Sequence, residues 1–261
     1  MRFKIYLEYE GTRYAGWQLQ KNSKTIQGEF FRVIEQLFQT KTFEFYGSGR
    51  TDSGVHAIEQ VAHLEVKTEL SAEKIKYSLN DRLPFDINVL HVEKCNPKFH
   101  ARHDATARSY IYLISRRKTA LGKQFVWWIK DELDFRAMKE AGKVFEGFKD
   151  FQAFSEDSPE EKSTLVELNY CDLYEYGDTI IIHICGSHFL WKMVRRMTGI
   201  LVEVGRKNLK PKDINDILQD PEFPVAKYTA PPSGLFLEKV YYPGEKVLRG
   251  EDTFKLPFSV I

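Results

Sequence analysis

Hydrophobic spacing switches between strand and helix periods in a set order along this chain, and that order constrains the fold more than any other feature. Residues 3–9 alternate apolar and polar side chains, as a half-buried strand does. An apolar stripe at helical spacing follows over residues 26–38, with Thr25 as its N-cap. Further elements are predicted at 42–46, 60–66, 71–79 and 86–92. The resulting order, β-α-β-β-α-β, is that of a ferredoxin-like sheet with helices on one face.

The second half of the chain repeats this order. Its predicted elements are strands at 105–115 and 235–242, helices at 134–145, 189–204 and 211–218, and a hairpin at 165–185 that turns at 176–178. We therefore expect an α+β fold of two ferredoxin-like (RRM-like) halves. These would form a mixed, mostly antiparallel sheet with helices on one face and a central active-site cleft. We place the boundary near Asp104, which gives halves of residues 1–104 and 105–261.

Composition restricts the class of protein. Hydrophobic residues make up 43% of the 261 residues, enough for a large core, and no eighteen consecutive residues are all apolar. The first residues lack a signal-peptide pattern, so we expect a cytoplasmic protein without a membrane segment. Three cysteines without CxxC spacing favour neither a disulfide framework nor a zinc site. Because the net charge is only +1, a nucleic-acid partner would have to be bound by local basic clusters.

The most distinctive local feature is a glycine-flanked loop, GSGRTDSG, at residues 47–54, which carries the candidate catalytic residue of the first half. It lacks the Gly-Lys-Ser/Thr of a P-loop and the alternating acidic residues of a calcium loop. It also leads into a strand, whereas a dinucleotide-binding motif opens a helix. Asp52 in this loop has two interpretations. It can cap a turn through backbone amides, or it can act as nucleophile or base, with Arg50 nearby to keep it ionised.

A second cluster combines arginine with tyrosine. On the strand predicted at 105–115, Arg108, Tyr110 and Tyr112 share one face. Such a face suits a phosphate backbone and a stacked base, but a solvated strand edge gives the same pattern. His100 and His103 are spaced i, i+3 without a third ligand near them in the sequence, so we predict no metal site.

Two further segments contain candidate residues. In SHFLWKMVRRMTGILVEVG, residues 187–205, the apolar positions predict a buried helix face. Arg195 in this segment either belongs to a solvated surface or supplies a cation for an acid in the cleft. In TAPPSGLFLEKVYY, residues 229–242, two prolines and a glycine predict a turn that places Leu235 at the mouth of a strand.

Together these segments resemble the tRNA pseudouridine synthases of the TruA type. GRTDSGVHA is similar to that family's catalytic loop, and FHARHDATARSYIY, FLWKMVRRMTG and TAPPSGLFL follow in the family's order. YEGTRYAGWQLQ, TIQGE and DFQAF also fit, so the resemblance covers nearly the whole chain. Two segments depart from the pattern: Lys162-Ser163-Thr164, where an Arg-Thr pair is frequent, and Lys227-Tyr228, where smaller residues are usual.

The resemblance implies conversion of uridine to pseudouridine on the 3′ side of the anticodon arm of tRNA, at tRNA positions 38, 39 and 40. It implies a homodimer and no metal or other cofactor. Asp52 would be the catalytic carboxylate, whether it attacks the base, attacks the sugar or removes a ribose proton. Arg195 would pair with Asp52, and Tyr110 would stack on the uracil and handle the C5 proton. Leu235 would line the other side of the ring.

The resemblance also implies contacts to RNA phosphates. Arg50 and Arg108 would contact phosphates and help to hold the target nucleotide out of its stem. Arg102 lies in a basic stretch, some of whose members we expect to meet the RNA backbone. This stretch consists of Lys94, Lys98, Arg102, Arg116, Arg117, Lys118 and Lys123.

Two functions from other classes are compatible with the same residues. A non-catalytic RNA-binding protein would keep Arg108 and Tyr110 but would not need Asp52. An aspartate-dependent hydrolase acting on a small nucleoside would release free uracil, which a synthase does not release.

Overall fold

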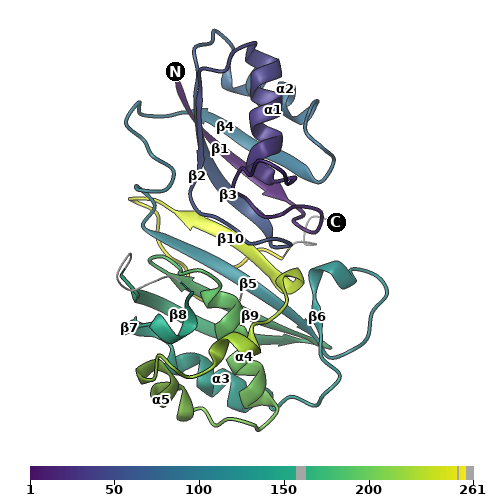
Figure 1. The fold of residues 1–261 in the computed structure, drawn as a ribbon, viewed down its shortest axis with the longest axis vertical. Coiled ribbons are helices and arrows are strands. Elements are labelled where there is room, and N and C mark those ends of the chain that lie inside the picture. The colour runs from purple at the N-terminus through teal and green to yellow at the C-terminus, as the bar shows by residue number, and fades with distance from the viewer. Residues whose placement is uncertain (157–162, 252, 257–261) are drawn as a thin grey trace. The chain divides into compact units, whose positions relative to one another are not determined.

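The computed structural model describes residues 1–156, 163–251 and 253–256, and in this part the chain forms two compact units (Figure 1). The first unit contains residues 1–106 and 236–246 and the described residues after 254. The second unit contains residues 107–235 and the described residues from 247 to 254. Most of the last strand therefore belongs to the first unit, although it follows the second unit in the sequence.

The first unit is a sheet with two helices. Its elements are β1 (Arg2–Tyr9), α1 (Ile26–Phe38), β2 (Glu44–Gly47), β3 (His56–Glu65), α2 (Ala72–Asn80), β4 (Ile87–Lys94) and β10 (Leu235–Tyr241). β1 lies between β4 and β3 and is antiparallel to both, and β2 is also antiparallel to β3. β10 is parallel to β3, with Phe236 opposite His56. The predicted β-α-β-β-α-β order and the α+β class are confirmed.

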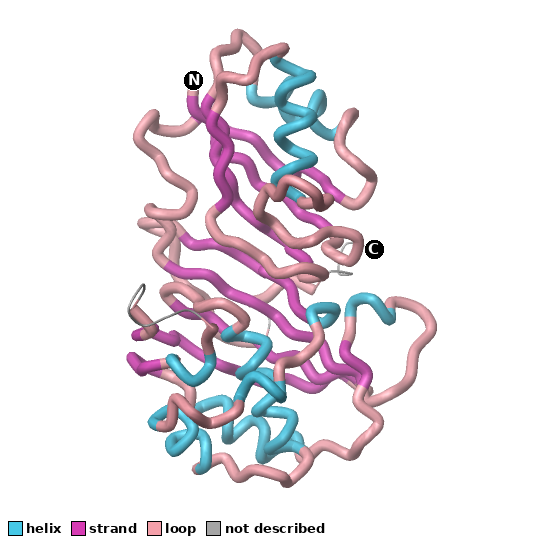
Figure 2. The backbone as a smooth tube through the Cα atoms, viewed as in Figure 1, coloured by secondary structure: helices cyan, strands magenta, loops and turns pink. Residues whose placement is uncertain are grey.

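Figure 2 shows the helices of the first unit lying against its strands. The apolar side chains of the strand alternation and of the helix stripe are buried in one core. Phe3 on β1 and Phe30 on α1 are both fully buried. Phe45 on β2 stacks on Phe30, with ring centroids 4.7 Å apart, so α1 covers this face of the sheet. Thr25 is the N-cap of α1, as predicted, and its side chain accepts a hydrogen bond from the N–H of Gly28.

The second unit contains a mostly antiparallel sheet and three helices among its described residues. Its elements are β5 (Ala107–Ser115), β6 (Trp127–Trp128), α3 (Phe135–Val144), β7 (Gly147–Asp150), β8 (Leu165–Tyr176), β9 (Thr179–Gly186), α4 (Met193–Gly205) and α5 (Asp213–Gln219). The strand order is β5-β9-β8-β7, with antiparallel neighbours, and β6 runs parallel to β5. No helix in the described ranges has both the length and the apolar character needed to cross a membrane.

Two details of the second unit differ from the sequence prediction. The helix predicted to begin at residue 189 begins at Met193, because Lys192 has a φ of +62° and helical backbone cannot extend through it. The short strands β6 and β7 were not predicted. With two and four residues they are too short to show a period.

Candidate active site

The loop at residues 48–55 joins β2 to β3 and carries Arg50 and Asp52. Its entrance is fixed by Ser48, whose N–H donates to the carbonyl of Val61 (2.7 Å) and whose hydroxyl donates to Gln60 Oε1 (2.6 Å). Asp52 is partly exposed, and its carbonyl accepts the N–H of Val55 (3.1 Å) in a tight turn. Arg50 is exposed. The loop is therefore anchored at its base and presents both charged side chains from a defined turn.

Residues 9–17, called the support segment here, hold this loop from one side. The N–H of Trp17 donates to the carbonyl of Thr51 (3.0 Å), and the hydroxyls of Tyr9 and Thr51 are 2.9 Å apart. The carbonyl of Tyr14 accepts the N–H of Gly54 (3.3 Å) and the hydroxyl of Ser53 (3.1 Å). These bonds fix the backbone on both sides of Asp52.

Glycines permit this close approach. Gly16 has a φ of +96°, and a Cβ there would lie 2.6 Å from the carbonyl oxygen of Thr51. A Cβ at Gly11 would lie 2.0 Å from the carbonyl oxygen of Val55. Side chains at these two positions would push the support segment away from the 48–55 loop.

A buried carboxylate anchors the support segment in turn. Asp86, whose side chain is 1% exposed, accepts the hydroxyl of Tyr14 (2.6 Å) at Oδ1 and two guanidinium donors of Arg13 at Oδ2 (3.0 and 2.5 Å). Burial by itself raises the pKa of Asp86, but the hydrogen bonds from Tyr14 and Arg13 outweigh it and hold the pKa below its ordinary value. The sequence prediction missed Asp86, because its partners lie more than seventy residues away in the chain.

In the second unit, two predicted residues share one face of β5. Arg108 donates from a terminal guanidinium nitrogen to the carbonyl of Ser187 (3.0 Å). The ring of Tyr110 meets the ring of Phe189 edge to face, with centroids 5.0 Å apart. The segment between β9 and α4 thus contacts both side chains and sets their directions.

Arg195 on α4 and the proline turn before Leu235 are also brought together. Arg195 Nε donates to the carbonyl of Ala230 (2.8 Å), and the N–H of Ala230 donates back to the carbonyl of Arg195 (3.1 Å). Tyr112 on β5 donates its hydroxyl to the carbonyl of Pro231 (2.8 Å). Leu235 is buried directly after this turn. Helix α4, strand β5 and the turn therefore form one connected group within the second unit.

The predicted site residues fall into two sets. Arg50, Asp52 and Arg102 belong to the first unit, where Arg102 is an exposed residue of the segment after β4. Arg108, Tyr110, Arg195 and Leu235 belong to the second unit. A single site composed of both sets is part of the function proposed below.

Of the two departures from the family pattern, the structure describes only the one at Lys227-Tyr228 in full. Lys162 lies outside the described residues. Lys227 and Tyr228 form part of a 3₁₀ turn, Val225–Tyr228, which packs directly on α4. A Cβ at Gly199 on α4 would lie 1.6 Å from the carbonyl oxygen of Tyr228, so only glycine allows this contact.

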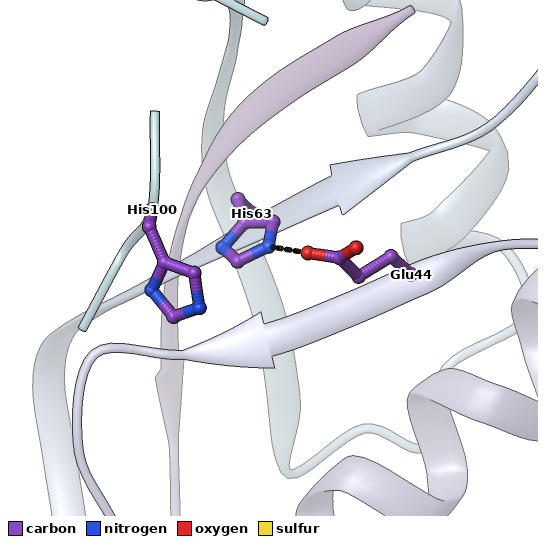
Figure 3. Close-up of side chains that lie close together, drawn as sticks. All are labelled: Glu44, His63 and His100. Carbon is purple, nitrogen blue, oxygen red and sulfur yellow. Dashed lines mark hydrogen bonds and ion pairs between the residues drawn. The ribbon is translucent and has the colours of Figure 1, made fainter. Parts of the chain in front are cut away.

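One group of side chains in the first unit has the composition of a metal site. Glu44, His63 and His100, called the histidine cluster here, each bring one ligand-type atom within 4.8 Å of the others (Figure 3). His63 Nε2 and Glu44 Oε1 are 2.6 Å apart. The sequence paired His100 with His103 instead, because Glu44 and His63 are brought to His100 only by the fold.

The ring hydrogen bonds of the histidine cluster do not fit a bound cation. Nδ1 of His63 accepts the N–H of Ala101 (3.1 Å), and Nδ1 of His100 accepts the N–H groups of Arg102 (3.2 Å) and His103 (3.3 Å). A neutral imidazole has one N–H, so Nε2 carries the hydrogen in both rings. A metal-ligating histidine instead donates from its second nitrogen to an acceptor. The cluster is therefore two neutral imidazole rings beside the Glu44 carboxylate, whose pKa the hydrogen bond from His63 lowers.

Burial supports the neutral state of both rings. It lowers the pKa of His63, and the hydrogen bond to Glu44 offsets this only in part. It also lowers the pKa of His100, to which the neighbouring His63 and His103 add. The cluster fixes Ala101, next to Arg102, onto β3.

Comparison with known proteins identifies the family. The chain matches the family model described as tRNA pseudouridine synthase over residues 5–104 and 141–243. It is 37% identical over 243 residues to tRNA pseudouridine synthase A 2 of Clostridium tetani, covering 92% of this chain and 98% of that protein. It is 37% identical over 247 residues to tRNA pseudouridine synthase A of Maridesulfovibrio salexigens, covering 92% of this chain and 90% of that protein.

Among solved structures, the chain is similar to part of an archaeal box H/ACA sRNP Nop10–Cbf5 complex, with a TM-score of 0.35 and 12% identity over 78% of this chain and 44% of that chain. The assignment rests on the sequence matches, which extend over both units. On these matches, the chain belongs to the tRNA pseudouridine synthase family.

Proposed function

We propose that this chain isomerises uridine to pseudouridine in tRNA, with Asp52 as the catalytic carboxylate. The observation that carries the proposal is the family match over both units. The relatives are named tRNA pseudouridine synthase A, and the loop that resembles the family's catalytic motif is the loop held by the support segment. Such fixed geometry is what a catalytic carboxylate requires.

The reaction is an isomerisation and needs no co-substrate. The N1–C1′ bond of the uridine breaks, the uracil turns within the site, and C5 bonds to C1′. The C5 proton is lost and N1 gains a proton, so atoms and charge balance. Asp52 begins the sequence by attack on the base or the sugar or by removing a ribose proton.

The second set of residues would act on the same nucleotide. Arg195 would pair with Asp52 through its terminal nitrogens, because its Nε is held by Ala230. An ion pair keeps a carboxylate ionised where water is excluded. Tyr110 would stack on the uracil and accept the C5 proton, and Leu235 would line the opposite face of the ring.

Basic residues would bind the RNA backbone. Arg50, Arg102 and Arg108 would contact phosphates on either side of the target nucleotide. Extruding a base from its stem costs a few kcal/mol, which stacking and phosphate contacts offset. We propose the 3′ side of the anticodon arm, at tRNA positions 38, 39 and 40, as the substrate region. We also propose a homodimer that works in the cytoplasm, where tRNA is processed.

The test is chemical mapping of pseudouridine in unmodified tRNA after incubation with wild type, Asp52→Asn and Asp178→Asn. Asp178 is an exposed aspartate in the turn between β8 and β9, so its change serves as the matched control. We expect product in the anticodon arm with wild type and the control and none with Asp52→Asn. The affinity of Asp52→Asn for tRNA should stay within a few-fold, because a carboxylate adds nothing favourable to phosphate binding.

Three other results would contradict the proposal. Tight tRNA binding without product in the wild type would favour a non-catalytic RNA-binding protein. Free uracil released in proportion to product would favour the nucleoside hydrolase. Loss of folding in Asp52→Asn would make Asp52 a turn cap instead of a catalytic group.

A further inference from the structure

An exposed phenylalanine stands beside the support segment. Phe85 is 87% exposed, at a turn closed by the hydrogen bond from the N–H of Ile87 to the carbonyl of Pro84 (3.0 Å). Its neighbour Asp86 is the buried anchor described above, and the carbonyl of Asp86 accepts the N–H of Glu10 (2.9 Å). The backbone under Phe85 is thus fixed, while its ring is left almost entirely in water.

The ring of Phe85 lies against a guanidinium that is itself held in place. The Cζ atom of Arg13 is 4.4 Å from the ring centroid, within the range of a cation–π contact. Arg13 Nε and a terminal nitrogen both donate to Asp86, so one edge of the guanidinium is occupied and its plane is set. The Arg13 side chain is 50% exposed. Phe85 and Arg13, called the platform here, therefore offer an aromatic face and a positive charge in a rigid arrangement.

The platform is directly connected to the 48–55 loop. Arg13 is followed by Tyr14, whose carbonyl accepts hydrogen bonds from Ser53 and Gly54, the two residues after Asp52. At about 3.8 Å between consecutive Cα atoms, this path places Arg13 within about 15 Å of Asp52. A nucleotide that flanks a target base at Asp52 can reach that far.

We propose that the platform binds an unpaired base of the RNA substrate, at a nucleotide flanking the one that is modified. This inference rests on the proposed function. Stacking on an aromatic ring suits any base, because every base has a π face, and the fixed guanidinium adds attraction for the base and for a phosphate. A flanking base loses its stacking partner when the target leaves the stem, and the platform replaces that partner.

An RNA base fits this surface better than a second protein chain does. The platform is one ring and one charge, far smaller than the apolar area of a stable protein interface. Lys24, whose ammonium lies 4.7 Å from the ring centroid of Tyr14, the residue after Arg13, adds a second cation to the surroundings of the support segment. Positive charge beside a single exposed ring is typical of single-stranded RNA binding.

The test uses four variants and the full chain. Phe85→Ala removes the ring, Phe85→Trp retains a stacking surface, and Phe85→Leu retains apolar area without a π face. Phe148→Ala is the control, because Phe148 is an exposed phenylalanine (65%) on β7 of the second unit. We expect Phe85→Ala to weaken binding of an unmodified anticodon stem-loop by about 5- to 150-fold. Phe85→Leu should weaken binding similarly, while Phe85→Trp and Phe148→Ala stay near wild type.

Two further measurements identify the bound group. The salt dependence of binding should be unchanged in Phe85→Ala, because no phosphate contact is removed with the ring. With an abasic nucleotide at one position flanking the target, wild type and Phe85→Ala should bind the stem-loop with equal affinity, as expected in a double-mutant cycle when the two groups contact each other.

Four outcomes would contradict the proposal that the platform binds a base. The first two are equal affinity of Phe85→Leu and wild type for the stem-loop, and equal loss of affinity in Phe85→Ala and Phe148→Ala. The other two are a loss of affinity in Phe85→Ala that persists with every abasic substrate, and a changed oligomeric state of Phe85→Ala in sedimentation. A wild type that binds tRNA without forming pseudouridine would contradict the proposed function instead, and the binding comparison would still decide on the platform.

Discussion

Replacing Tyr14 with phenylalanine should destabilise the protein through one missing hydroxyl. The ring remains, so the contact with Lys24 is retained, but Oδ1 of Asp86 loses its 2.6 Å donor. Because the Asp86 side chain is 1% exposed, water cannot replace the hydroxyl. Hydrogen bonds to charged groups contribute about 1.5–3 kcal/mol, so we expect the free energy of unfolding to fall by about that amount.

Tyr6→Phe is the matched control for this change. The hydroxyl of Tyr6 donates to Glu93 Oε1 at 2.9 Å, but the Glu93 side chain is 45% exposed and can be hydrated instead. We expect this variant to lose about 0.5–1 kcal/mol. Urea unfolding of both variants followed by circular dichroism gives the two free energies. Equal losses would refute the argument that Asp86 is a buried anchor.

Tyr14→Phe should also slow the formation of pseudouridine. The carbonyl of Tyr14 holds Ser53 and Gly54, so a looser support segment lets the 48–55 loop move. We expect a lower single-turnover rate of pseudouridine formation at saturating enzyme, with tRNA affinity close to wild type. An unchanged rate in a measurably destabilised protein would show that Asp86 supports the fold without positioning Asp52.

Further predictions concern the loop and the histidine cluster. Gly16→Ala should reduce the single-turnover rate at least tenfold, because its φ is +96° and a Cβ would lie 2.6 Å from the carbonyl oxygen of Thr51. Gly49→Ala is the control: a Cβ there meets nothing within 4 Å, so its rate should stay near that of the wild type. Burial lowers the pKa of His63 in the folded protein, so just below pH 6.5 only the unfolded chain binds a proton at this imidazole. The free energy of unfolding should therefore be constant above about pH 6.5 and should decrease as the pH falls towards the pKa of His63 in the folded protein. As the pH is lowered below about 6.5, the urea midpoint should decrease less in His63→Gln than in the control His91→Gln, which retains His63. Zinc should not raise the melting temperature of the wild type relative to EDTA, and a zinc-dependent rise that His63→Gln abolishes would contradict the hydrogen-bond assignment.

Spacing along the chain was sufficient to predict much of the fold. The alternation in β1, the apolar stripe of α1 and its cap at Thr25 depend on residues close in sequence, and local rules describe them. The start of α4 could not be predicted in this way. Residues 189–191 continue its apolar pattern, and only the backbone angle of Lys192 shows that the helix starts later.

The candidate site was predictable only in part, for a related reason. Motif residues such as Asp52 and Arg195 stand in recognisable segments. The residues that hold those segments come from distant parts of the chain: Asp86 meets Tyr14 across 72 positions, and Tyr112 meets Pro231 across 119. Ordinary side chains in such supporting roles carry no pattern of their own, so neither Asp86 nor the exposed Phe85 beside it was expected to bear on the site.

Because β10 pairs with β3, the sheet of the first unit cannot be completed during synthesis until β10 has been translated. Phe236 and Leu237 lie beside His56 and Ala57, the residues at which the chain leaves the 48–55 loop, and the ring of Phe236 stacks on His56 with centroids 4.7 Å apart. A ribosome adds roughly 5–20 residues per second, so this edge of β3 waits on the order of ten seconds for its partner. During that interval the nascent first unit carries an exposed strand edge, which is a hazard for aggregation. A strand translated about 180 residues after the start of β3 thus completes the sheet next to the end of the proposed catalytic loop.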